Sequence, residues 1–249
     1  MKFNDIDKIY FLHLSDRYDR EEWMNKQIQQ IGFPKNKINI WWTCRRNISN
    51  QIYKYIPQLD INNYITNRIT TNPLMGGGAF NCAFEHYSII RTSYERGFKH
   101  ILIFEDDVKF LVNLKTFKKF IKLLPSNYQV CKFINVVWEN DIITEKSTYY
   151  NTIPQENQKI TNPYQFIYGS TELDYASTCG YMLDHEGMRK VIEIYNKRFC
   201  IADHIFQYLN FYVCNYQLMS TQDWNCPPNE YLWSDLWKLN TSQRFNQFK

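Results

Sequence analysis

The 249-residue sequence lacks a concentrated charge of either sign. Its formal net charge is +4, charged residues make up 22% of the chain, and no run of Lys or Arg is longer than two. A nucleic-acid-binding protein needs a basic patch or stripe on its surface. The composition therefore argues against DNA or RNA as a partner, although single basic residues suit anionic substrates.

Long apolar runs are also missing. The first apolar stretch, Ile9–Leu12, is short and follows Asp5 and Asp7, unlike a signal peptide or a membrane anchor. Low-complexity tracts and internal repeats are absent, and aromatic residues make up 17% of the chain, far above the content of disordered proteins. We therefore expect one cytoplasmic α/β domain with no transmembrane segment.

Cysteine pairs with the spacing of a structural zinc site do not occur. The seven cysteines contain no C-x-x-C pair. An odd number of scattered cysteines is typical of buried free thiols in a reducing compartment, and some disulfides after secretion are the alternative. The seven are Cys44, Cys82, Cys131, Cys179, Cys200, Cys214 and Cys226.

Three consecutive carboxylates follow a short apolar run, Ile101–Phe104. Such a run predicts a strand buried on both faces, so Glu105, Asp106 and Asp107 fall where the strand leaves its sheet. Ligands of open α/β sheets bind at this edge, and a hard divalent cation takes clustered carboxylate oxygens. The alternative is a solvated acidic turn, but the buried strand before it favours a metal site.

Hydrophobic periodicity predicts alternating strands and helices. In the first half we expect strands at Lys8–Leu14 and Lys37–Thr43, a helix at Arg20–Gln30 ended by Gly32, and a helix at Ala79–Arg96 that is opened by Gly76–Gly78 and closed by Gly97. Further on we expect helices at Leu114–Leu124 and Glu186–Asn196, strands at Val130–Val137 and Tyr175–Leu183, a helix from Asp203, and a polar surface excursion at Glu139–Tyr168.

Four segments in the same order resemble glycosyltransferase family 25, which contains bacterial lipooligosaccharide glycosyltransferases and procollagen galactosyltransferase domains. They are IYFLHLSDRYDR, GAFNCAFEHYSIIRTSYERGFKHILIFEDDV, TCGYMLDHEGMRKVI and TQDWNCPPNEYLWSDL. The resemblance implies a GT-A type, Rossmann-like α/β fold with a central mixed, mostly parallel sheet flanked by helices. It implies one domain over residues 1–249, with a nucleotide-sugar-binding half at 1–137 and an acceptor-binding half at 138–249.

The resemblance also implies that Glu105-Asp106-Asp107 acts as the family's DXD element. Glu105 and Asp107 are two residues apart and point the same way on an extended segment, so they can share one ribose, metal and diphosphate assembly. Asp107 is the expected metal ligand, Glu105 faces the ribose or a metal-bound water, and Asp106 contacts the donor or is structural. Mn²⁺ or Mg²⁺ suits this oxygen site.

The end of the first strand is the expected uridine site. Leu14 would contact the nucleotide there, and either Arg17 or Arg20 would reach a phosphate, although Arg20 also fits an ordinary helix surface. Backbone N–H groups after Gly76–Gly78 are a further anion site if these glycines open a helix rather than form a loop.

Other side chains are assigned from their places in the matching segments. His86 lies one helical turn after Cys82 and is either a substrate or metal contact or a buried core histidine. Tyr181 and Trp224 are expected substrate contacts, with packing as the alternative for Trp224. Asp223 is expected to complete the metal shell or to contact the acceptor.

Sugar transfer with inversion needs a group that takes the proton of the acceptor hydroxyl. Asp203 is the expected base, and its alternative role is a helix cap. Asp174 and Asp184 are further candidates for the base.

The predicted function is metal-dependent transfer of galactose or glucose from a UDP-sugar to a glycan or glycosylated acceptor, either a lipooligosaccharide or a collagen-type hydroxylysine glycan. One alternative is an inactive glycan-binding or scaffold protein on the same fold, to which the altered motif residues His13, Asn81 and Glu85 would point. The other is a metal-dependent hydrolase or nucleotidyltransferase that uses the same carboxylates.

Overall fold

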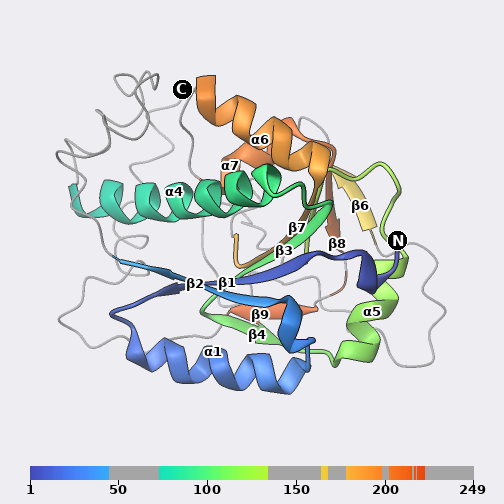
Figure 1. The fold of residues 1–249 in the computed structure, drawn as a ribbon, viewed down its shortest axis with the longest axis horizontal. Helices are drawn as coiled ribbons and strands as arrows, with labels where there is room; N and C mark the ends of the chain where they lie inside the picture. Colours follow the sequence, from blue (N-terminus) through green and yellow to red (C-terminus); the bar gives the residue numbers. More distant parts are fainter. Residues whose placement is uncertain are drawn as a thin grey trace, which may run out of the picture.

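The chain folds around a seven-stranded sheet that carries helices on both faces (Figure 1). The computed structural model describes residues 1–44, 73–133, 164–167, 178–197, 202–214, 216 and 218–221, with the backbone alone at 73–80, 165–167, 203–204 and 207. The strand order is β2-β1-β3-β7-β5-β8-β6. The strands are β1 (Lys8–Leu14), β2 (Ile38–Thr43), β3 (His100–Glu105), β5 (Val130–Lys132), β6 (Tyr164–Ile167), β7 (Gly180–Asp184) and β8 (Phe211–Cys214).

The sheet is mixed, and most of its strands run in one direction. β1 is parallel to both β2 and β3, and β5 is parallel to β8. β7 is antiparallel to its neighbours β3 and β5, and β6 is antiparallel to β8. All strands except β6 and β7 therefore share one direction, which confirms the predicted mixed, mostly parallel sheet. A separate antiparallel pair consists of β4 (Val108–Phe110) and β9 (Met219–Thr221).

Helices cover both faces of the sheet because its central strands are apolar on both sides. Tyr10 and Leu12 pack under α4 (Pro73–Glu95), α6 (His185–Lys197) and α7 (Ala202–Ile205). Ile9 and Phe11 face the other way, toward α1 (Tyr18–Ile31) and α5 (Leu114–Lys122). Short 3₁₀ turns complete the described elements: η1 (Phe3–Asp5), η2 (Lys35–Lys37) and η4 (Phe206–Tyr208). None of the helices in the described part of the chain combines the length and apolarity that a membrane span requires.

The local predictions for the first half are largely confirmed. β1 has the predicted bounds, β2 begins one residue later than predicted, and α1 extends the predicted helix at both ends. Gly32 and Gly97 follow α1 and α4 with φ of 72° and 71°, the left-handed backbone that glycine adopts without a steric penalty. In the second half, β5, β7, α5 and α6 lie within one or two residues of their predicted ranges where those ranges are described.

Two local predictions are wrong. Gly76–Gly78 do not open a helix, because α4 already begins at Pro73 and runs through them. Proline is favoured in the first helical turn, where its missing N–H has no partner to lose, and this signal outweighs the glycines. β6 lies inside the segment predicted as a surface excursion, since four residues of alternating character are too few to stand out from their polar surroundings.

Candidate functional site

The predicted acidic residues lie where the carboxyl ends of β1, β2 and β3 meet. Leu14 pairs with Thr43, and Leu12 pairs with Glu105, so the three parallel strands end at the same edge. Asp106 is 4% exposed. The side chains of Asp107 and Glu105 are 18% and 25% exposed. In a solvated acidic turn these carboxylates would be exposed to water, so their burial favours a ligand-binding site at the end of the strand.

Strand alternation sends the first two carboxylates to opposite faces of the sheet. Glu105 continues the side of Ile101 and Ile103, which pack toward α4, whereas Asp106 continues the side of Leu102 and Phe104. The strand ends at Glu105, and Asp106 and Asp107 form the turn into β4. The prediction of an extended segment through all three residues is therefore wrong, because the pairing of β4 with β9 redirects the chain here.

Asp106 is the centre of a buried polar network. Its Oδ2 accepts hydrogen bonds from His13 Nδ1 at 2.9 Å and from the Leu14 backbone N–H at 3.2 Å. Its Oδ1 accepts from Arg20 Nη1 at 2.8 Å. Burial opposes ionisation of Asp106, but these donors outweigh it and hold the pKa of this carboxyl below its usual value. Asp106 therefore joins β1, α1 and the acidic turn, and it positions Leu14 instead of facing the open edge.

Of the two arginines considered for phosphate contact, Arg20 is the one at the acidic turn. Its guanidinium pairs with Asp106 and lies 3.7 Å from Asp107 Oδ2. Arg17, at the N-cap of α1, pairs instead with Asp19 at 2.7 Å. The side chain of Arg20 is 24% exposed and partly retains access to solvent. It is therefore the better-placed partner for a phosphate that approaches this edge.

Helix α1 is held against β4 by two hydrogen bonds. Trp23 Nε1–H donates to the Val108 carbonyl at 2.9 Å, and the Phe110 N–H donates to Gln27 Oε1 at 2.9 Å. Phe104 and Phe110, on either side of the turn, have ring centroids 5.1 Å apart. Aromatic pairs of this kind contribute about 0.5–1.5 kcal/mol beyond their buried area. These hydrogen bonds and ring contacts hold the acidic turn in place, as a preorganised binding site requires.

Asp107 is ionised with difficulty in the absence of a cation. Burial and the neighbouring Glu105 charge raise the pKa of Asp107 to about 7, and Arg20 offsets only part of this effect. The Cys179 thiol donates to Asp107 Oδ1 at 3.2 Å. Burial and the two carboxylates in turn raise the pKa of the Cys179 thiol well above its usual value, so this cysteine is a neutral donor. A divalent cation would stabilise the charged form of Asp107.

Glu105 belongs to a second network, on the α4 side of the sheet. Its Oε1 accepts a hydrogen bond from Thr178 Oγ1 and lies 3.2 Å from His86 Nε2. Burial opposes ionisation of Glu105, but the hydrogen bond and charge of His86 hold its pKa below the usual value. His86 Nδ1 lies 2.7 Å from the hydroxyl of Tyr181, which is completely buried. Tyr181 therefore reaches the site through His86.

The remaining predicted residues lie elsewhere or outside the described residues. Asp184 pairs with His100 at the opposite end of β3, roughly 16 Å from Glu105 at ~3.3 Å per residue. It accepts the Gly187 N–H at 2.6 Å and so acts as a helix cap, and the prediction that it is a possible base is wrong. Asp203 lies in α7, and only the backbone of this residue is described. Asp174, Asp223 and Trp224 fall outside the described residues.

Two residues of the site were missed by the sequence reasoning. Thr178 and Cys179 precede β7 and contact Glu105 and Asp107, respectively. The Glu105 N–H donates to the Cys179 carbonyl at 3.0 Å, which fixes their place beside the acidic turn. Both stand in the third matching segment, but their contacts depend on β7 pairing antiparallel to β3, which local sequence does not reveal.

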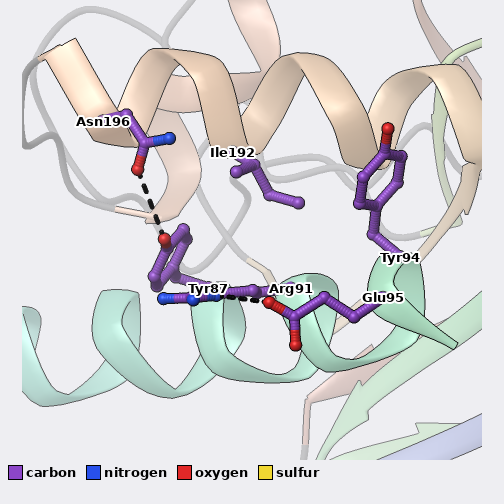
Figure 2. Close-up of a pocket in the computed structure, with 6 residues that line it drawn as sticks. All are labelled: Tyr87, Arg91, Tyr94, Glu95, Ile192 and Asn196. Carbon is purple, nitrogen blue, oxygen red and sulfur yellow. Dashed lines mark hydrogen bonds and ion pairs between the residues drawn. The ribbon is translucent and has the colours of Figure 1, made fainter.

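A separate hollow of about 260 Å³ lies between α4 and α6 (Figure 2). Its carboxylate, Glu95, is paired with Arg91 at 2.8 Å. Tyr94 and Glu95 stand at the end of α4 shortly before β3 begins, so this hollow extends away from the acidic turn. It is lined by Tyr87, Arg91, Tyr94, Glu95, Ile192 and Asn196.

Of three comparisons with known proteins, the family comparison agrees with the resemblance seen in the sequence. Among solved structures, A197 from STIV is 9% identical, with 90% of this chain and 98% of that chain covered and a TM-score of 0.42. The apo form of mouse xyloside xylosyltransferase 1 is also 9% identical, with 83% and 72% covered and a TM-score of 0.31. No curated protein gives a significant match.

The pattern of the family described as glycosyltransferase family 25 (LPS biosynthesis protein) matches residues 6–206. Because this match covers most of the chain, the protein belongs to glycosyltransferase family 25.

Proposed function

We propose that the protein transfers a hexose, galactose or glucose, from a UDP-sugar to a glycan or glycosylated acceptor. The observation that carries the proposal is the acidic turn of a family 25 chain at the carboxyl edge of its parallel strands, where the pKa of Asp107 is raised to about 7. A carboxylate that is costly to ionise alone is suited to a cation, and a cation is what a departing diphosphate needs.

The carboxylates of this turn fit Mn²⁺ or Mg²⁺. Asp107 would hold the ion, and Glu105 would hold it or the donor ribose, because hard divalent cations prefer carboxylate oxygens. Bound there, the ion would neutralise the charge that develops on the leaving UDP. Arg20, partly exposed beside Asp107, would contact the diphosphate. Asp106 would keep Leu14 and Arg20 in position, and it would not touch the donor.

The acceptor side needs a group that activates the acceptor hydroxyl. We propose Asp203 as the base that takes the proton of the acceptor hydroxyl while the anomeric bond breaks. Its helix, α7, continues into Phe206, whose ring centroid is 4.6 Å from that of Tyr181, so the helix backbone runs beside the His86 network. Asp223 and Trp224 are proposed to contact metal and sugar, although the family match ends at residue 206. Residues 1–137 would bind the donor and 138–249 the acceptor.

The family description favours a lipooligosaccharide acceptor over a collagen-type glycan. UDP release from UDP-galactose and UDP-glucose should be measured with Mn²⁺, Mg²⁺ or chelator, with and without each acceptor. We expect metal-dependent release that an acceptor accelerates and that Asp107→Asn abolishes. Glu193→Gln, which neutralises a half-exposed carboxylate on α6, is the matched control and should behave like the wild type.

The two rival functions give different results in the same assay. An inactive glycan-binding protein would bind acceptor without releasing UDP from either donor under any metal condition. A hydrolase or nucleotidyltransferase would show turnover that no glycan acceptor changes. Either result would contradict the proposed transfer.

A further inference from the structure

Three side chains of different chemistry converge beside the acidic turn. The Cys82 sulfur, a ring nitrogen of His86 and a Glu105 carboxylate oxygen all lie within 4.8 Å of one another. Cys82 and His86 are one helical turn apart on α4, and Glu105 comes from the end of β3. Ligands of one zinc ion lie about 2.0–2.3 Å from it, so in a tetrahedral site they are roughly 3.3–3.8 Å apart. The three donors therefore lie within about 1.5 Å of the spacing of a shared metal ion.

Two of these donors already have the outer partners that metal ligands require. His86 Nδ1 lies 2.7 Å from the Tyr181 hydroxyl, which both donates and accepts and can therefore accept a hydrogen bond from Nδ1–H when Nε2 binds a metal. Thr178 Oγ1 donates to Glu105 Oε1. A bound ion would replace the direct 3.2 Å contact between His86 Nε2 and Glu105. Partners of this kind orient ligands toward a common point.

The site is open enough for an ion to enter. His86 is 2% exposed, whereas Cys82 is partly exposed and the Glu105 side chain is 25% exposed. One ligand is thus held rigidly in the core and two lie toward solvent. Three protein ligands leave a fourth position for water or substrate, as in zinc sites that take part in chemistry.

We propose that Cys82, His86 and Glu105 form a binding site for a borderline-soft transition-metal ion, with Zn²⁺ as the preferred occupant. A thiolate, an imidazole and a carboxylate favour Zn²⁺ or Co²⁺, whereas Mn²⁺ and Mg²⁺ favour oxygen ligands alone. The site is distinct from the oxygen site of Asp107 in its donor set and shares only Glu105 with it. This inference goes beyond the proposed sugar transfer, and its test needs no donor sugar.

The full chain should be stripped with chelator and titrated with Co²⁺ under reducing conditions. A thiolate bound to Co²⁺ produces a charge-transfer band in the near ultraviolet, and we expect this band at one equivalent and its loss on adding Zn²⁺. In the unaltered protein, Zn²⁺ should also protect Cys82 from iodoacetamide, as measured by mass spectrometry of the peptides. This second readout uses no substitution and so does not depend on a variant that folds.

Substitutions assign the band to its ligand. Cys82→Ser should abolish it, and Tyr181→Phe should weaken Zn²⁺ binding about 10-fold or more through the loss of the His86 partner. Cys44→Ser, at an exposed cysteine, is the matched control and should leave band and affinity unchanged. The proposal would be overturned if the wild type showed no band or if folded Cys82→Ser kept it. It would also be overturned if Cys179→Ser lost the band while Cys82→Ser kept it.

Discussion

Replacing Asp107 by Asn is expected to stabilise the metal-free protein while removing a proposed metal ligand. The native pKa of Asp107 is raised from 3.8 to about 7, chiefly by burial and then by Glu105. Between these two pH values the native state keeps a proton that the unfolded state has released. Stability therefore falls as the pH rises from about 4 to 7, and the loss is complete above pH 7.

The size of this effect follows from the pKa shift. About 3 pH units correspond to ~4 kcal/mol, and we halve this to about 2 kcal/mol because the side chain keeps contact with solvent. Asp107→Asn should thus be about 2 kcal/mol more stable than the wild type at pH 8 in chelator, and within about 0.5 kcal/mol of it at pH 4.5. Saturating Mn²⁺ with UDP should reverse the order at pH 8, because only the wild type gains binding energy, ~2.7 kcal/mol at 100 times Kd.

Urea denaturation at both pH values, followed by circular dichroism, measures these differences. Glu193→Gln neutralises a half-exposed carboxylate and should show no pH-dependent gain. If Asp107→Asn is no more stable than the wild type at pH 8, or if its gain is the same at pH 4.5, then ionisation of Asp107 does not destabilise the native state and the reasoning fails.

Three further outcomes test other parts of the structure. Asp106→Ala should lower the free energy of unfolding by about 3–5 kcal/mol at pH 7 in urea titrations, because it leaves buried His13 and the Leu14 N–H without their acceptor and removes the nearer carboxylate from Arg20, and a loss below about 1 kcal/mol would contradict the network. Gly187→Ala should cost about 1–3 kcal/mol by thermal unfolding, since its Cβ would lie 2.2 Å from the Gln129 carbonyl oxygen. Asp203→Asn should keep donor affinity but lose on the order of 10²-fold in kcat, whereas near-normal kcat at saturating substrates would leave Asp203 as a cap alone.

The position of the acidic turn could be predicted because it depends on local sequence. Ile101–Phe104 is too apolar for a surface strand, and this alone places Glu105 at the carboxyl end of a buried strand. β1 and the helix after it, α1, could be predicted equally well, since the hydrophobic period and the terminating glycine, Gly32, indicate the same helix end. Signals that conflict locally were misread, as at Gly76–Gly78, where Pro73 sets the helix start.

The partners within the site could not be predicted, because they depend on pairing between distant strands. Asp106 meets His13 only because β1 and β3 are parallel neighbours in one register. Thr178 and Cys179 reach the turn only because β7 returns antiparallel beside β3. Cys82 and His86 were seen to share a helix face, but local sequence does not reveal that Glu105 faces them.

Binding of UDP in the presence of Mn²⁺ tests the central claim most directly. Isothermal titration should show that the wild type binds UDP with Mn²⁺ and more weakly with chelator. Folded Asp107→Ala should lose the metal-supported part, because the substitution removes the proposed metal ligand at a strand end and leaves the core intact. Unchanged binding of UDP and Mn²⁺ by folded Asp107→Ala would contradict the account and move the donor site away from the acidic turn.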